Sequence, residues 1–151
     1  MIRVICGLLV FFWAGCAYAS IYAITDEKAI LSIVGEAEAE SYEGKLAVAY
    51  TIMNRGSLKG VYGLKAKRVL AKKYSKKAYE DAKRAWYTAK SNTPKNWKAM
   101  GWGNASDVVI FKKQAWFKKC YIVKTIGNHH FWAVKEVATA YDNPPKRIKT
   151  D

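Results

Sequence analysis

The chain has 151 residues, of which 51% are hydrophobic and 25% are charged. This composition predicts one globular domain and excludes an intrinsically disordered chain. The net charge of +14 indicates an anionic partner such as nucleic acid, a membrane surface or an acidic polymer. Three cysteines are too few for a disulfide-stapled scaffold, and two histidines argue against a multi-histidine metal centre.

The first residues have the layout of a secretory signal peptide. Arg3 is followed by an uncharged run through Ile24, and small residues at positions 17 and 19 predict cleavage before Ser20. Residues 1–19 would then be removed, and the protein would be exported to the periplasm, the cell wall or the medium. The same run is long enough to span a bilayer if it stays uncut, as a retained anchor in contact with the membrane. A lipidated Cys16 and a buried N-terminal helix are further alternatives.

Two helices are expected in the first third of the chain. Apolar residues recur at helical spacing from Asp26 to about Glu40, and Thr25 is a suitable N-cap. A second helix is expected over residues 42–55, with Ser41 as its N-cap and Gly56 as its end. Because this second helix is apolar on nearly every face, it is expected to be central and buried.

The remaining chain predicts a third helix and little other regular structure. The third helix is expected from about Ser75 to Lys90, with one alanine-rich stripe and a basic opposite face. We therefore expect a mainly α (α+β) single domain over residues 20–145. Beyond the third helix we expect a loop over 91–107, a short strand or buried segment over 108–111, a segment of ambiguous structure over 116–134, and a basic tail over 146–151.

The charged residues are unevenly distributed. Thirteen basic residues and two acidic ones lie between Lys59 and Lys98, whereas acidic residues predominate from Asp26 to Glu43. The lysines form either a solvated face or a surface that holds the protein on an anionic polymer. Binding of the second kind would weaken as the salt concentration rises.

The segment between Gly35 and Gly44 contains four glutamates within eight residues. Glu36 lies beside the apolar stripe of the first expected helix, and a carboxyl group against apolar walls can stay protonated near neutral pH. A general acid must carry a proton at the working pH in order to donate it. Glu40 is expected one turn further on the same helix face, with Glu38 pointing elsewhere. The alternative is an acidic, solvated helix end without chemistry.

Two ordered motifs resemble the cell-wall hydrolase SleB family, which contains spore-cortex-lytic enzymes and their phage relatives. The first motif comprises Gly35-Glu36-Ala37, then Tyr42-Glu43-Gly44, then an alanine-rich segment that ends in Asn54-Arg55. The second motif is Ile126-Gly127-Asn128-His129-His130-Phe131, close to the C-terminus. The resemblance extends from about Ala29 to Trp132.

The resemblance implies a lysozyme-like domain that cleaves the bond between N-acetylmuramic acid and N-acetylglucosamine in peptidoglycan. Glu36 matches the catalytic glutamate of the family, and a lytic transglycosylase needs this one carboxyl group and no metal ion or cofactor. Four tryptophans are candidates for stacking on sugar rings: Trp97, Trp102, Trp116 and Trp132. The candidate substrate-binding residues are Glu40, Tyr42, Asn54, Asn128 and His129.

Other functions remain open at this point. A retaining muramidase would need a second carboxylate about 5–5.5 Å from the first, and Glu40 is the local candidate for that group. A non-catalytic module that binds the cell wall or another polyanion is a further alternative.

The expected partners are peptidoglycan strands and anionic envelope polymers. An exported protein seldom meets nucleic acid, so nucleic acid is not expected as a partner, and we expect a monomer. A phage endolysin and a bacterial wall enzyme both fit these expectations.

Overall fold

The structure is a computed structural model that describes residues 24–135. The expected signal peptide over 1–19 and the expected tail over 146–151 lie outside the described residues, as does the end of the expected domain at 145. Within residues 24–135, helices predominate and one small sheet is present, so the expected mainly α (α+β) class is confirmed. None of the helices in this range is long and apolar enough to cross a membrane.

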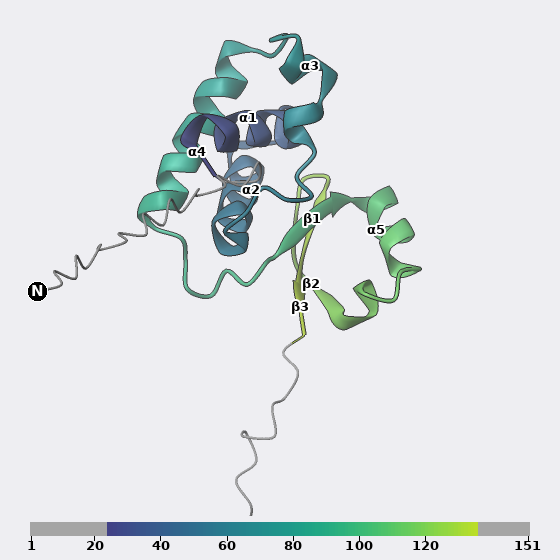
Figure 1. Ribbon diagram of the computed structural model, residues 1–151. Helices are drawn as coiled ribbons and strands as arrows, with labels where there is room; N and C mark the ends of the chain where they lie inside the picture. Colours follow the sequence, from purple (N-terminus) through teal and green to yellow (C-terminus); the bar gives the residue numbers. More distant parts are fainter. Residues whose placement is uncertain (1–23, 136–151) are drawn as a thin grey trace, which may run out of the picture.

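Three long helices form the framework of the helical part of the described chain, which Figure 1 shows beside the small sheet. Thr25 and Ser41 cap the first two as expected, and Ser75, the expected start of the third, proves to be its cap. The hydroxyl group of each accepts a hydrogen bond from a backbone N–H group of the first turn. Gly56 ends the second helix in the left-handed conformation, with a φ of +61°. These helices are α1 (Asp26–Ala37), α2 (Tyr42–Arg55) and α4 (Lys76–Ser91).

Helix α2 occupies the centre of this helical part, as expected. It contacts α1 and α4 on one side and strands β1 (Gly101–Asn104) and β2 (Cys120–Ile126) on the other. Its side chains Val48, Ala49 and Ile52 are fully buried. The burial of apolar surface between these elements is the main stabilising contribution to the helical part.

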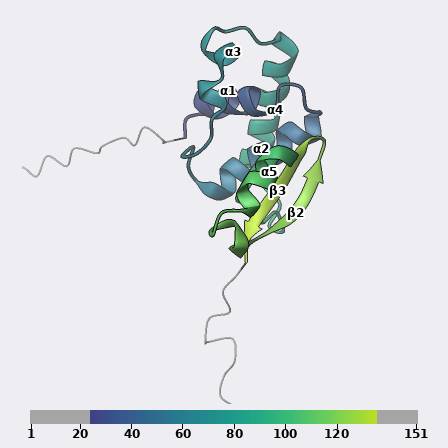
Figure 2. The ribbon, with the colours of Figure 1, turned by 90° about the vertical axis from the view of Figure 1, so that its right-hand side faces the viewer.

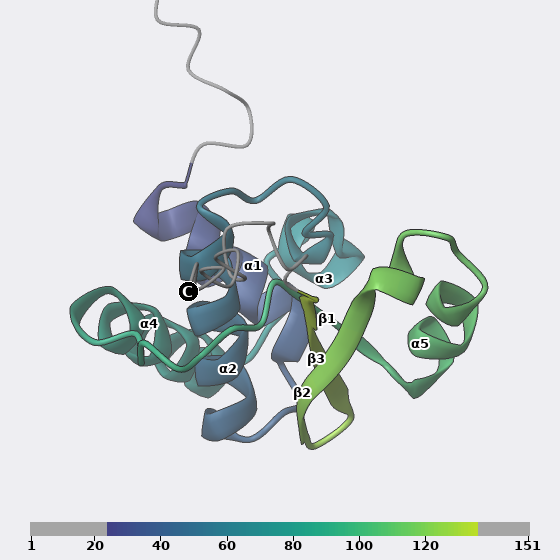
Figure 3. The same ribbon diagram turned by 90° about the horizontal axis from the view of Figure 1, so that it is seen from below.

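The smaller part consists of an antiparallel sheet in the order β1-β3-β2, with β3 spanning His129–Val134. Gly127 has a φ of +54° in the tight turn between β2 and β3, a conformation that glycine adopts without steric cost. Figure 3 shows α4, α2, the sheet and then α5 (Ala105–Lys112) following one another across the molecule. Figure 2 shows α5 in front of β3.

Short helical segments complete the described chain. Residues 63–70 contain two of them, and a third precedes β2. The 3-10 helix η1 contacts α1 and closes one side of the site described below. The segments are η1 (Gly63–Lys65), α3 (Lys67–Leu70) and η2 (Phe117–Lys119).

Two expectations about the chain between 91 and 111 are wrong. The expected loop over 91–107 contains strand β1, and the expected short strand or buried segment over 108–111 belongs to helix α5. The helix forms because Asn104 and Asp107 make a reciprocal capping box at its start. Only Val108 of the four apolar residues is buried, while Val109 and Ile110 are exposed.

The first helix also ends earlier than expected. It stops at Ala37, and residues 38–40 form a turn in which the Glu40 N–H donates to the Ala37 carbonyl. Arg68 donates to the Gly35 carbonyl at 2.6 Å, and a cation at this end of a helix is favourable. Glu40 therefore does not share a helix face with Glu36, contrary to expectation.

Candidate active site

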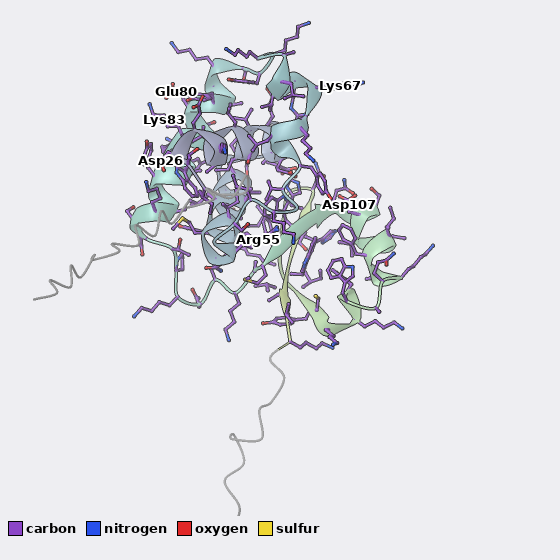
Figure 4. The ribbon with its side chains drawn as sticks, in the orientation of Figure 1. Asp26, Arg55, Lys67, Glu80, Lys83 and Asp107 are labelled. Carbon is purple, nitrogen blue, oxygen red and sulfur yellow. The ribbon has the colours of Figure 1, made fainter. Side chains whose placement is uncertain are left out.

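A cleft of about 820 Å³ lies between the helical part and the sheet with α5. Aromatic side chains make up much of its wall, and Glu36, Asp107, Arg55 and Lys59 are its charged residues. Figure 4 labels Arg55 on the α2 side and Asp107 on the α5 side. The aromatic side chains of the lining are Tyr62, Trp102, Phe111, Trp116 and Trp132.

Glu36 lies in the last turn of α1, and three N–H donors fix its carboxylate in the cleft. Its Oε1 accepts hydrogen bonds from the backbone N–H groups of Tyr62 at 2.8 Å and Gly63 at 2.5 Å. Its Oε2 accepts one from the indole N–H of Trp102 at 3.2 Å. Because each carboxylate oxygen can accept two hydrogen bonds, Oε2 keeps one lone pair for another group.

The backbone donors reach Glu36 because two glycines lie in contact. A Cβ atom at Gly35 would lie 2.5 Å from the Gly63 Cα and even closer to the Gly63 carbonyl. A Cβ atom at Gly63 would overlap the carbonyl oxygen of Ser32 and lie 3.0 Å from the Glu36 Cγ. Side chains at either position would therefore separate η1 from α1. Because both residues are glycine, η1 packs closely against α1, and the N–H groups of Tyr62 and Gly63 reach the Glu36 carboxylate.

Arg55 supplies positive charge close to Glu36. Its guanidinium group lies 5.8 Å from the centroid of the Trp102 ring, within the range of a cation–π contact. It also donates to the Lys59 carbonyl, which fixes the loop after α2. Burial lowers the pKa of Arg55, and the negative charge of Glu36 opposes that shift. The Arg55 side chain stays protonated because its normal pKa lies far above neutral pH.

His129 and Trp102 lie on the same face of the sheet. In the register of β1 and β3, Asn104 is opposite His129 and Trp102 is opposite Phe131. Because opposite residues point to one face, and alternate residues along a strand do as well, these side chains share the face toward the helices. His130 points to the other face, as expected for adjacent residues in a strand. Its Nδ1 lies 2.9 Å from the Thr125 hydroxyl.

The structure brings two of the six predicted site residues into the cleft, namely Glu36 and His129. Glu40 does not line the cleft, because its carboxylate is directed at the β2–β3 turn, where it accepts from the Asn128 N–H at 3.4 Å. The open alternative in which Glu40 is the second carboxylate of a retaining muramidase is therefore not favoured by this position. Asn128 lies in that turn and does not line the cleft either.

Tyr42 and Asn54 also lie away from the cleft lining and have other contacts. The Tyr42 hydroxyl lies 3.3 Å from the Thr88 hydroxyl, and the Arg84 guanidinium group lies 4.1 Å from the centroid of its ring. The Asn54 amide group donates to the carbonyls of Trp97 and Ala99, just before β1. Asn54 thus holds the segment that leads to Trp102.

Three of the four candidate tryptophans line the cleft: Trp102, Trp116 and Trp132. Trp97 instead packs against Tyr50 and Phe131. The backbone donors of Tyr62 and Gly63 were not predicted, because an N–H group that binds a distant carboxylate has no side-chain signal. The proximity of Arg55 to Glu36 and the place of Asp107 in the lining were also not foreseen.

The histidine, cysteine and acidic side chains of residues 24–135 are dispersed. In that range no three histidine, cysteine or acidic side chains lie together in a way that could hold a metal ion.

Comparisons with solved structures find two bacterial neighbours. One is the catalytic domain of the germination-specific lytic transglycosylase SleB from Bacillus anthracis, with 24% identity, a TM-score of 0.49, and coverage of 70% of this chain and 91% of that one. The other is the catalytic domain of the Bacillus cereus SleB protein, with 21% identity, a TM-score of 0.46, and coverage of 70% and 87%. Both neighbours carry the name of the family that the sequence motifs resemble. No protein-family model matches the chain, and a comparison with curated proteins finds no match.

Proposed function

We propose that the protein is an exported peptidoglycan lytic transglycosylase in which Glu36 is the single catalytic carboxyl group. The observation that carries the proposal is the fixed orientation of Glu36 in an aromatic cleft, with two donors on Oε1 and one on Oε2. Aromatic walls suit the apolar faces of sugar rings. The sequence motif around Glu36 indicates the same chemistry.

In the proposed reaction, the Glu36 carboxyl group transfers a proton from Oε2 to the oxygen that joins N-acetylmuramic acid to N-acetylglucosamine. The bond between this oxygen and C1 of the muramic acid breaks. The Glu36 carboxylate then takes the proton of the C6 hydroxyl group of the same muramic acid, whose oxygen bonds to C1. The products are a 1,6-anhydro end and a free hydroxyl group on the leaving sugar, and Glu36 regains its proton.

The observations favour this reaction over a retaining hydrolase, which needs a second carboxylate. Among the residues that line the cleft, Asp107 is the other acid. Its Oδ2 accepts from the Asn104 N–H at 3.0 Å in the capping box of α5, which gives Asp107 a structural role. A muramidase that uses Asp107 is nevertheless the second candidate function.

The decisive experiment is the digestion of purified peptidoglycan, with mass spectrometry of the soluble products. Replacement of Glu36→Gln should reduce product release by about 10²- to 10⁴-fold, since that is the usual contribution of general acid–base catalysis. Glu43→Gln is the matched control, because Glu43 lies on the surface in an ion pair with Lys124. Full activity of the Glu36→Gln variant would refute the mechanism.

The chemical form of the products separates the candidates. Anhydro-muramic ends that depend on Glu36 support the transglycosylase, whereas reducing muramic ends indicate a hydrolase. In the second case Asp107→Asn should abolish activity, and in the first it should have little effect. If the wild-type protein releases nothing from several types of peptidoglycan, the non-catalytic wall-binding module becomes the better interpretation.

We also propose that the lysines near the start of α4 hold the protein on anionic polymers of the envelope. Four of them are exposed on the described surface: Lys72, Lys73, Lys76 and Lys77. Reversal of these charges should weaken binding to cell walls and flatten its dependence on salt. Binding that is unchanged and insensitive to salt would contradict this electrostatic contribution.

A further inference from the structure

His129 and Glu40 form a buried pair at the edge of the cleft. His129 is 8% exposed and lines the cleft, and among residues 24–135 its buried Nδ1 has no hydrogen-bond partner. The nearest acidic atom is the Glu40 Oε1, at 3.8 Å. A buried polar atom without a partner destabilises the folded state, so this arrangement indicates a functional role for His129 beyond packing.

The place of the Glu40 carboxylate is built by residues from both sequence motifs. A Cβ atom at Gly127 would overlap the Glu40 Oε2, and a Cβ atom at Gly44 would lie 3.0 Å from the Glu40 Cβ. The Asn128 N–H donates to the Glu40 Oε2, and the Lys45 ammonium group donates to the Glu40 carbonyl. The Glu40 side chain is only 10% exposed. Its carboxylate is therefore held in one direction, toward His129.

This direction determines where the proton of a neutral His129 lies. A carboxylate only accepts hydrogen bonds, so an unprotonated Nδ1 would place a lone pair against its negative charge. A proton on Nδ1 is favoured instead. The 3.8 Å between Nδ1 and the Glu40 Oε1 is long for a hydrogen bond, and such distances in a free active site often shorten when a ligand binds. The Nε2 atom then carries the lone pair. Because Nδ1 lies 3.8 Å from the Glu40 Oε1, Nε2 is then the ring nitrogen left for a ligand in the cleft that His129 lines.

We propose that Glu40 is a positioning residue that keeps the proton of His129 on Nδ1, so that Nε2 accepts a hydrogen bond from a sugar hydroxyl group in the cleft. The inference rests on the proposed function, because it assigns a saccharide to the cleft. His129 shares its face of the sheet with Trp102, which donates to Glu36. Glu36 and His129 also line the same cleft, so a saccharide bound at Glu36 can extend to the His129 acceptor.

The proton position can be measured directly, without activity, by nitrogen NMR of the histidine rings in the full chain. The chain has two histidines, so His130→Gln assigns the signals. The wild-type protein should show His129 protonated on Nδ1 and unprotonated on Nε2 above the pH at which the ring loses its second proton. Glu40→Gln should shift His129 toward the other tautomer, because a carboxamide can also donate to Nδ1. A wild-type His129 protonated on Nε2, or a tautomer unaffected by Glu40→Gln, would overturn the proposal.

Kinetics on peptidoglycan fragments test the acceptor. His129→Ala and Glu40→Gln should each lower kcat/KM about tenfold, and the double variant should lose little more, because both remove one interaction. His129→Gln should recover part of the activity, since its amide oxygen can replace Nε2, and His130→Gln should be neutral. Additive losses, or no recovery with glutamine, would refute the acceptor role. If Glu36→Gln stays active, the proposed function fails. The tautomer measurement does not depend on activity, so it still tests whether Glu40 keeps the proton of His129 on Nδ1.

Discussion

Replacement of Gly35→Ala tests whether the contact between α1 and η1 builds the site. In an isolated helix this change should stabilise, because alanine is favoured over glycine by about 1 kcal/mol. In this protein the new methyl group would lie 2.5 Å from the Gly63 Cα and closer to the Gly63 carbonyl. Backbone atoms cannot rotate away as a side chain does. The packing therefore predicts the opposite sign from the helix propensity.

The magnitude follows from these two opposing terms. Overpacking against backbone costs up to about 3 kcal/mol, and the gain in helix propensity is about 1 kcal/mol. We expect a net loss of about 2 kcal/mol in the free energy of unfolding, which lowers Tm by roughly 5 to 10 °C for a domain of this size. The displacement of η1 should also separate the Tyr62 and Gly63 N–H groups from Glu36. Activity should therefore fall even at temperatures where the variant is folded.

Urea unfolding followed by circular dichroism, together with peptidoglycan digestion, measures both effects. Gly44→Ala is the matched control for stability within α2, because the atom nearest to its methyl group would be the Glu40 Cβ, at 3.0 Å, and not a backbone atom as at Gly35. That control should change stability by less than about 1 kcal/mol. A Gly35→Ala protein as stable as the wild type, with full activity, would refute the argument that close backbone contact builds the site.

Three further predictions concern single contacts. Trp102→Phe keeps an aromatic ring but removes the donor to the Glu36 Oε2, so kcat/KM should fall about tenfold with unchanged secondary structure; unchanged kinetics would contradict this role. Asn54→Ala should lower the free energy of unfolding by about 1–2 kcal/mol in urea titrations, because two carbonyl groups before β1 lose their donor; an unchanged midpoint would refute it. Burial lowers the pKa of Lys45, so the folded state releases this proton at lower pH than the unfolded chain. Relative to Lys45→Met, wild-type stability should therefore rise as the pH increases toward the normal pKa of lysine, and parallel stability curves for the two proteins would contradict that.

Local rules were enough to predict the helical part of the fold. The hydroxyl groups of Thr25 and Ser41 cap the first two long helices as expected, Gly56 ends α2, and the third helix starts close to Ser75 as expected. Such signals act within a few residues, so they can be recognised before the tertiary structure is known. The same rules would have identified α5, because Asn104 and Asp107 have the spacing of a capping box. The run of four apolar residues at 108–111 is also typical of a buried strand, and this second signal conflicts with the first.

The prediction for Glu40 was wrong because helical spacing applies only while the helix continues. Helix α1 ends at Ala37, and the direction of Glu40 is determined by Gly44, Gly127 and Asn128. Two of these residues lie more than eighty positions away in the chain. The spacing within one motif therefore could not show that the two motifs meet at this carboxylate.

The sequence by itself determined the helical class and the caps at Thr25 and Ser41, because these depend on neighbouring residues and apolar periodicity, whereas Glu36 was a candidate acid through the resemblance of its motif. Only the tertiary structure decided what surrounds Glu36. Its partners are two backbone N–H groups and an indole N–H from distant segments, and the close contact of Gly35 with Gly63 brings the backbone donors into place. Contacts of this kind depend on the packing of whole elements, which a local pattern does not encode.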